Sequence, residues 1–140
     1  MSFLPEDDRD YLELKGLPFE LKEEHGPDGT ARHGLLFPAF DFSGGLFSRD
    51  GNGTLVPCPR CKVLVLIPAG YSTTRLDSFY TSPRLHRSDG ALPDRAAGEA
   101  DLFGERWQFW SRHLSETEWR AGIDGIDIYL QYIRRELRAA

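Results

Sequence analysis

The rest of the chain is organised around residues 62–83, whose sequence is K-V-L-V-L-I-P-A-G-Y-S-T-T-R-L-D-S-F-Y-T-S-P. Its first part, Val63 to Ile67, is a short apolar run rich in β-branched residues, which is typical of a strand buried on both faces. Pro68 ends this run because proline cannot donate a hydrogen bond to a neighbouring strand. A second aromatic and β-branched run, Ser78 to Ser82, follows a loop of small residues. The pattern predicts two neighbouring sheet strands, and any antiparallel hairpin would also fit it.

The residues before this stretch predict one helix and two strands. Pro5 to Lys15 begins with proline and acidic residues, which favour the first turn of a helix, and Gly16 follows as a stop signal. Residues 18–24 alternate between apolar and polar side chains, as in a strand with one face in water. Residues 33–42 are apolar and aromatic but contain Pro38, which places this second strand at a sheet edge or a bulge.

Two further stretches, rich in glycine and other loop residues, are expected to lie largely outside the main strands. Residues 43–61 form a glycine- and cysteine-rich insertion between strands, with a small hairpin predicted at the D-G-N-G sequence of residues 50–53. Residues 84–101 show no strong period and are expected to cross the surface as a long loop. Long loops of this kind often carry function.

The C-terminal third of the chain predicts helices. In residues 103–114, Trp107, Trp110 and Leu114 recur at i, i+3 and i+7, which is the spacing of one helical face. In residues 126–137 the apolar side chains recur every three or four positions, which predicts an amphipathic final helix. The expected class is therefore α+β: a helix, consecutive strands, a long loop and then helices.

Composition narrows the function classes. A chain of 140 residues is expected to form a single domain, residues 1–140. Its net charge is −5 and no basic block occurs, so no nucleic-acid partner is expected. No apolar run approaches the roughly 18 residues that a membrane span needs, and the N-terminus resembles no signal sequence, so a cytoplasmic protein is expected.

The C-P-R-C sequence, with Cys58 and Cys61, predicts thiol or metal chemistry rather than a structural disulfide, because the cytosol keeps thiols reduced. Two cysteines at this spacing can place both thiolates on one tetrahedral zinc ion, which makes half of a zinc site. His25 and His33 are the candidates to complete four ligands. The alternative is an exposed pair of thiols without metal.

The order of elements and several motifs resemble those of ubiquitin-conjugating enzymes. P-A-G-Y at residues 68–71 followed by F-Y-T at residues 79–81 is similar to their proline–tyrosine turn and the Phe-x-Thr of their fourth strand. The whole chain resembles a bacterial branch, the prokaryotic ubiquitin-conjugating-like family E. The shared motifs are L-P-E-D-D (4–8), P-A-G-Y (68–71), W-Q-F-W-S-R-H (107–113) and W-R-A-G-I-D-G (119–125).

The resemblance implies a ubiquitin-conjugating-like fold with an N-terminal helix, an antiparallel four-stranded meander, a long loop and C-terminal helices. It also implies a role in a bacterial ubiquitin-like conjugation pathway, with defence against viruses as one use. The implied partners are a ubiquitin-like protein, its activating enzyme and a metal-dependent deconjugating peptidase.

One departure from the resemblance concerns the catalytic residues. Ubiquitin-conjugating enzymes carry His-Pro-Asn after the fourth strand and then a cysteine that holds ubiquitin as a thioester. Here the corresponding residues are H-R-S-D followed by G-A-L-P, so His86 lies near the histidine position and Pro93 stands at the cysteine position. The asparagine that would stabilise the oxyanion is missing. Cys58 and Cys61 precede the third strand of the meander, so the thioester role is not carried over to them.

Two functions within this pathway are compatible with that departure. The first is a cysteine-less adaptor or pseudoenzyme that binds the ubiquitin-like protein or its activating enzyme. The alternative is a transferase that carries the ubiquitin-like protein as an ester on Ser88 or Ser111. A serine needs a base to take its proton, and His86 and His113 are the candidates. Ser111 and His113 are not a preformed pair, because residues two apart on a helix point in different directions.

A third function lies outside the pathway. Cys58 and Cys61 would then belong to a small zinc ribbon that serves as an interaction module. The same ribbon could also be an insertion in a conjugating-like domain, so a bound zinc ion would not exclude the first two functions. No other cofactor is expected.

Overall fold

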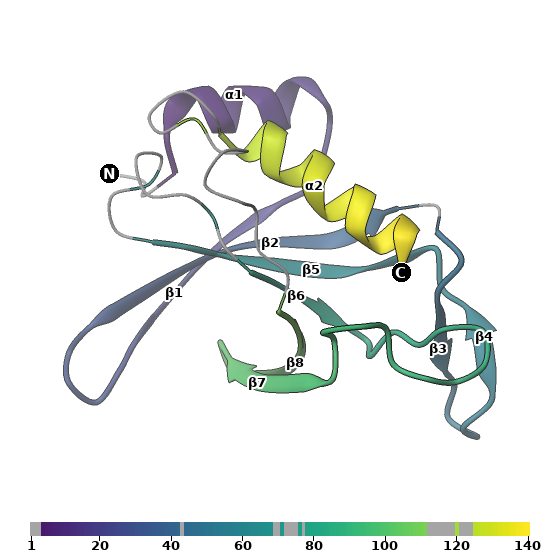
Figure 1. Cartoon of the computed structure of the whole chain (residues 1–140). Coiled ribbons are helices and arrows are strands. Elements are labelled where there is room, and N and C mark those ends of the chain that lie inside the picture. Colours follow the sequence, from purple (N-terminus) through teal and green to yellow (C-terminus); the bar gives the residue numbers. More distant parts are fainter. Residues whose placement is uncertain are drawn as a thin grey trace.

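The computed structural model describes residues 4–42, 44–68, 71, 76, 78–111, 120 and 125–140. Both helices lie on the same face of a curled antiparallel sheet (Figure 1). The elements in chain order are α1 (Glu6–Leu14), β1 (Glu20–His25), β2 (Ala31–Asp41), β3 (Phe47–Arg49), β4 (Leu55–Pro57), β5 (Arg60–Ile67), β6 (Phe79–Ser82), β7 (Gly98–Leu102), β8 (Glu105–Trp110) and α2 (Ile126–Ala139). This arrangement confirms the α+β class, the first helix and the final helix. No helix in these ranges is long and apolar enough to cross a membrane.

The main sheet has six strands in the order β1-β2-β5-β6-β8-β7. β5 pairs with β6 from Lys62 opposite Ser82 to Val65 opposite Phe79, so the predicted pair of neighbouring strands is confirmed. β5 is buried on both faces, as its apolar run predicted. The expected meander is present as β1, β2, β5 and β6, but β8 and β7 extend the sheet beyond four strands.

Local sequence chemistry explains two irregular features. The pairing of β2 with β5 shifts between Phe37 and Phe40, so Pro38 lies at a β-bulge, where a missing N–H group costs no ladder hydrogen bond. β3 and β4 form the predicted small hairpin, in which the Asp50 carboxylate accepts hydrogen bonds from the N–H groups of Asn52 and Thr54. This hairpin forms a two-stranded sheet of its own, and along the chain it connects β2 to β5 (Figure 1).

The helix predicted for residues 103–114 is wrong in its described part. Glu105–Trp110 is strand β8, and it pairs with β7 at the end of the segment expected to be a loop. Trp107 and Trp110 belong to different cores rather than to one helical face, because each face of β8 is covered by other elements. An aromatic run buried on both faces shows no period of two, and so its strand character is hidden in the sequence.

The two faces of the main sheet carry separate apolar cores. The face beneath α1 and α2 forms the larger core. On the opposite face, Leu36, Leu64, Leu102 and Trp107 form a smaller one. The β7–β8 hairpin therefore covers the face that the helices leave uncovered.

The turn of the β7–β8 hairpin reaches across the sheet to strands β1 and β2. Phe103 and Gly104 both have positive φ angles, of 52° and 76°, and such a backbone is unusual for phenylalanine. The Phe103 N–H donates a hydrogen bond of 3.0 Å to the Glu24 carboxylate in β1. Its ring fills the space beside Gly34, where an added β-carbon would lie 2.8 Å from the nearest ring atom. These contacts account for the curl of the sheet and for glycine at position 34.

We expect Gly34→Ala to lower the free energy of unfolding by about 1–3 kcal/mol, since the new methyl group overpacks against the Phe103 ring. Urea denaturation would measure this loss. In a Phe103→Leu background the same substitution should cost clearly less, because the ring is gone. An equal cost in both backgrounds would show that the ring contact does not select glycine.

Candidate functional site

The connection between β6 and β7, residues 83–97, is the segment where the resemblance places catalytic chemistry. Its two ends are held together by the buried side chain of Gln108 in β8. The Gln108 carbonyl oxygen accepts hydrogen bonds from the Leu85 N–H at 2.8 Å and from the Thr81 hydroxyl at 2.9 Å. The amide nitrogen donates to the carbonyl oxygens of Leu85 at 3.1 Å and Ala96 at 3.0 Å. All four hydrogen-bonding positions of the amide are therefore used within the protein.

Trp110 extends this buried polar network. Its indole N–H donates a hydrogen bond of 2.8 Å to the Thr81 hydroxyl, which in turn donates to Gln108. The Trp110 ring stacks on Phe79, with ring centroids 5.5 Å apart. The F-x-T of β6 and the W-Q-x-W of β8 are thus one unit, and it fixes the base of the β6–β7 connection.

His86 is anchored by its backbone and by one ring nitrogen. It exchanges two backbone hydrogen bonds with Phe47 of β3, so the connection packs against the β3–β4 hairpin. Its Nδ1 lies 3.2 Å from the Gly90 carbonyl oxygen. Because a carbonyl oxygen only accepts, this contact requires the proton on Nδ1 and leaves Nε2 of the neutral ring as an acceptor.

The two candidate serines lie at different places on the connection. Ser88 is exposed in a tight turn closed by the Gly90 N–H, which donates to the Arg87 carbonyl. No hydrogen bond joins Ser88 to His86 among the contacts of the described residues. Ser111 follows β8, and its N–H donates to the Arg95 carbonyl at 2.8 Å. The other candidate base, His113, lies outside the described residues.

Both cysteines are buried, so the expectation of an exposed thiol pair is wrong. Cys58 is 8% exposed and Cys61 is 5% exposed, because both pack into the larger core. The Cys58 thiol donates to the Arg60 carbonyl oxygen at 3.0 Å. Burial, with a smaller effect of Cys58 beside it, raises the pKa of the Cys61 thiol above its ordinary value. A protonated, buried thiol is a poor nucleophile and a poor metal ligand.

The described part of the chain does not complete a zinc site around these thiols. It contains no group of three or more histidine, cysteine, aspartate or glutamate side chains placed to hold a metal ion. His25 ends β1, and His33 in β2 pairs with Glu23 at 2.9 Å. Zinc binding by Cys58 and Cys61 stays a prediction, and neither β1 nor β2 supplies further ligands for it.

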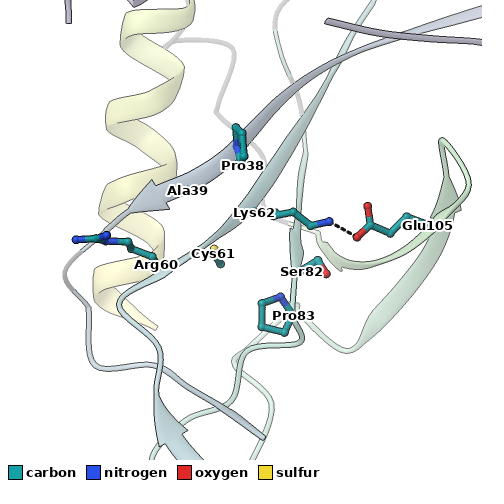
Figure 2. Close-up of a pocket in the computed structure, with 8 residues that line it drawn as sticks. All are labelled: Pro38, Ala39, Arg60, Cys61, Lys62, Ser82, Pro83 and Glu105. Carbon is teal, nitrogen blue, oxygen red and sulfur yellow. Dashed lines mark hydrogen bonds and ion pairs between the residues drawn. The ribbon is translucent and has the colours of Figure 1, made fainter. Parts of the chain in front are cut away.

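A pocket of about 320 Å³ lies beside the start of the β6–β7 connection. It is bounded by the β2 bulge, the first residues of β5 and Ser82-Pro83 (Figure 2). Lys62 and Glu105 form an ion pair across one side of it (Figure 2). The Lys62 ammonium also lies 5.4 Å from the centroid of the Trp107 ring. The pocket can accept a small apolar group next to a fixed pair of opposite charges.

A second buried polar group joins three of the motifs. Asp8 of α1 is 7% exposed, and it accepts hydrogen bonds from the Tyr71 hydroxyl at 2.5 Å and from the Ile126 N–H at 3.3 Å. Burial raises the pKa of Asp8, while its hydrogen bonds oppose that shift. A β-carbon on Gly125 would lie 2.4 Å from a carboxylate oxygen of Asp8, so a larger residue there would displace the Asp8 side chain. Asp8 thus caps the N-terminus of α2 from another helix.

The motifs L-P-E-D-D, P-x-G-Y and G-I-D-G therefore contribute to one cluster, and the W-Q-x-W and F-x-T motifs contribute to the other. The sequence matches the family described as Prokaryotic E2 family E over residues 4–140. The chain belongs to this family. No curated protein and no solved structure was found to match it. Membership in prokaryotic E2 family E associates the chain with ubiquitin-like conjugation.

The structural roles of Gln108 and Asp8 do not follow from the sequence analysis. In the sequence Gln108 is one letter of the W-Q-F-W-S-R-H motif, and Asp8 is one of several acids in the first turn of a helix. A signal for Gln108 was present, because an amide between two tryptophans in a run of aromatic residues predicts a buried polar side chain that needs partners. Within prokaryotic E2 family E, this chain uses both residues to hold segments that are distant in sequence.

We expect Gln108→Leu to lower the free energy of unfolding by about 2–4 kcal/mol, because it leaves buried backbone groups at Leu85 and Ala96 unpaired. Denaturant unfolding gives the stability, and hydrogen exchange at the Leu85 amide reports on the connection itself. The matched control is Gln131→Leu at an exposed position of α2. Similar losses in the two variants would argue against a special role for the Gln108 amide.

Asp8→Asn should raise stability at neutral pH relative to the natural chain. The asparagine oxygen keeps the Ile126 bond, its amide can donate to the Tyr71 hydroxyl, and no buried charge remains. Since the pKa of Asp8 is raised in the folded state, its ionisation penalises folding as pH rises above the ordinary value of 3.8. The advantage of the variant should therefore vanish in acid and grow toward neutral pH in denaturant titrations.

Asp8→Ala is the contrasting variant. It should lose about 1–3 kcal/mol in acid, since the Tyr71 hydroxyl and the Ile126 N–H lose their acceptor. The loss should shrink toward neutral pH, because alanine also removes the ionisation that penalises the natural chain. If Asp8→Asn were as unstable as Asp8→Ala at neutral pH, the carboxylate charge itself would be the stabilising feature.

Proposed function

We propose that this chain acts in ubiquitin-like conjugation as an adaptor without a catalytic cysteine, which binds the ubiquitin-like protein, its activating enzyme or both without forming a thioester. The observation that carries the proposal is the composition of the β6–β7 connection. This connection contains His86 and Ser88 but no cysteine, and Pro93 stands where the resemblance would place the thioester residue.

The positions of the two cysteines support the same proposal. Acyl transfer between thiols requires a thiolate that can reach the thioester of the activating enzyme. Cys58 and Cys61 lie in the larger core, and the pKa of Cys61 is raised by burial. Neither thiol is suited to this exchange in the described conformation.

A second function is favoured by the surroundings of Ser88. This residue is exposed, it lies two positions after His86, and His86 Nε2 is left as an acceptor by the contact of Nδ1 with Gly90. In an ester mechanism the Ser88 oxygen would replace the thiol of the activating enzyme on the acyl carbon. The hydroxyl proton would pass to His86, the carbon–sulfur bond of the thioester would break, and the departing thiolate would take that proton from His86.

The alternative on Ser111 depends on His113, and the zinc-ribbon module depends on ligands beyond Cys58 and Cys61. No contact of the described residues favours either one. The deconjugating peptidase and a role in antiviral defence stay predictions from the resemblance. The cytoplasm likewise stays the expected location.

A charging reaction tests both functions. The protein is mixed with the activating enzyme and ubiquitin-like protein of its pathway and ATP, and its intact mass is recorded. We expect no adduct, while size-exclusion chromatography shows that the protein comigrates with one of the two partners. An adduct that survives thiol, is cleaved by mild base and is lost in Ser88→Ala but not in Ser111→Ala would instead establish the ester.

The cysteines supply the control for this experiment. A thiol-sensitive adduct that disappears in Cys58→Ser or Cys61→Ser would overturn both the adaptor and the ester. Absence of both adduct and comigration would argue against any direct role with these partners.

A further inference from the structure

Two arginines of α2 are held against the end of β2 by contacts that leave their charge unpaired. The Arg134 guanidinium lies 4.9 Å from the centroid of the Phe40 ring. The Arg138 Nε donates a hydrogen bond of 2.8 Å to the Phe42 carbonyl oxygen. Ring and carbonyl contacts fix the two side chains without neutralising them.

A third arginine approaches the same strand end from β5. Arg60 Nε lies 3.4 Å from a carboxylate oxygen of Asp41, which is a long and solvent-exposed ion pair. Arg60 also borders the pocket beside Pro38 and Cys61 (Figure 2). Arg60, Arg134 and Arg138, here called the arginine cluster, therefore contact three consecutive residues at the end of β2, Phe40 to Phe42. Of the three, Arg60 borders the apolar pocket.

The arginine cluster is positively charged, whereas the chain as a whole is acidic. The protein carries 22 acidic residues and a net charge of −5, yet no carboxylate of the described residues forms an ion pair with Arg134 or Arg138. The two lie at i and i+4 on α2, where like charges destabilise a helix. The negative end of the helix dipole and the Phe40 ring offset that repulsion. Most guanidinium N–H donors of the pair remain available to an anion.

The geometry suits carboxylates on an extended chain. Side chains four apart on a helix are separated by about 5–6 Å. Alternate residues of an extended strand lie about 6.6 Å apart on the same side. Two carboxylates at alternate positions of an extended segment can therefore meet Arg134 and Arg138 together. A long polyanion fits less well, because the net charge of −5 repels it.

We propose that the arginine cluster binds an acidic, extended segment of a partner protein, with one apolar side chain of that segment in the neighbouring pocket. The inference goes beyond the proposed function, because it requires neither charging nor the candidate residues His86 and Ser88 of the β6–β7 connection. It assigns a binding role to the C-terminal helix and the β2 bulge.

The test uses a fluorescein-labelled ten-residue peptide with glutamate at alternate positions and one central leucine, followed by fluorescence anisotropy at low salt. Arg134→Gln and Arg138→Gln should each weaken binding about fivefold, the upper range for an exposed ion pair. The matched control is Arg135→Gln, which removes the same charge from the same helix but lies off the cluster, beside the Tyr132 ring. It should weaken binding less than about twofold.

Peptide controls separate sequence from charge. Replacing the glutamates by glutamine should abolish binding, and replacing the leucine by serine should weaken it. Circular dichroism of each variant confirms that the helix is retained.

Four results would overturn the proposal. The first is no binding of the peptide, and the second is an equal loss in all three glutamine variants, which would indicate net charge alone. The third is tighter binding of a single-stranded DNA of equal charge, which would assign the cluster to phosphates. The fourth is salt-sensitive self-association, seen by sedimentation and lost in Arg134→Gln, which would make a second copy of this chain the occupant.

Discussion

The central strand β5 carries apolar side chains on both faces, and both faces have to be kept from water. The helices α1 and α2 cover one face, and the β7–β8 hairpin covers the other by folding back until Phe103 reaches Gly34. This second cover requires the sheet to curl and to continue beyond β6. The positive φ of Phe103 is compatible with this arrangement because the surrounding contacts fix the turn.

Two buried polar side chains then determine how the β6–β7 connection, Tyr71 and the start of α2 attach to this sheet. Gln108 satisfies its whole amide on the connection between β6 and β7, and Asp8 binds both the tyrosine turn and the start of α2. Buried polar groups are costly without partners, so each residue restricts the chain to a conformation that supplies them. The motifs that carry the resemblance to prokaryotic E2 family E therefore have structural roles in this chain, and they need not mark catalytic atoms.

The features that the sequence predicts correctly are those that depend on residues close together in the chain. The apolar run of β5, the bulge at Pro38, the aspartate–glycine hairpin and the amphipathic α2 each follow from a few neighbouring residues. Strand β8 was mistaken for a helix because its burial on both faces depends on partners far away in the chain. The burial of Cys61 escaped prediction for a related reason. The C-P-R-C spacing describes what the thiols could bind, while the alternation of β5 decides that this one points into the core.

The candidate site also combines features that neighbouring residues determine with features that depend on the folded chain. Histidine and serine positions after β6 could be found by counting from a motif, but the tautomer of His86 depends on the Gly90 carbonyl, which only the folded turn supplies. A connection whose ends are tied by one amide, and whose middle rests on the β3–β4 hairpin, presents a fixed surface to a partner. Fixed surfaces lose little conformational entropy on association, so this arrangement is suited to the recognition of a partner.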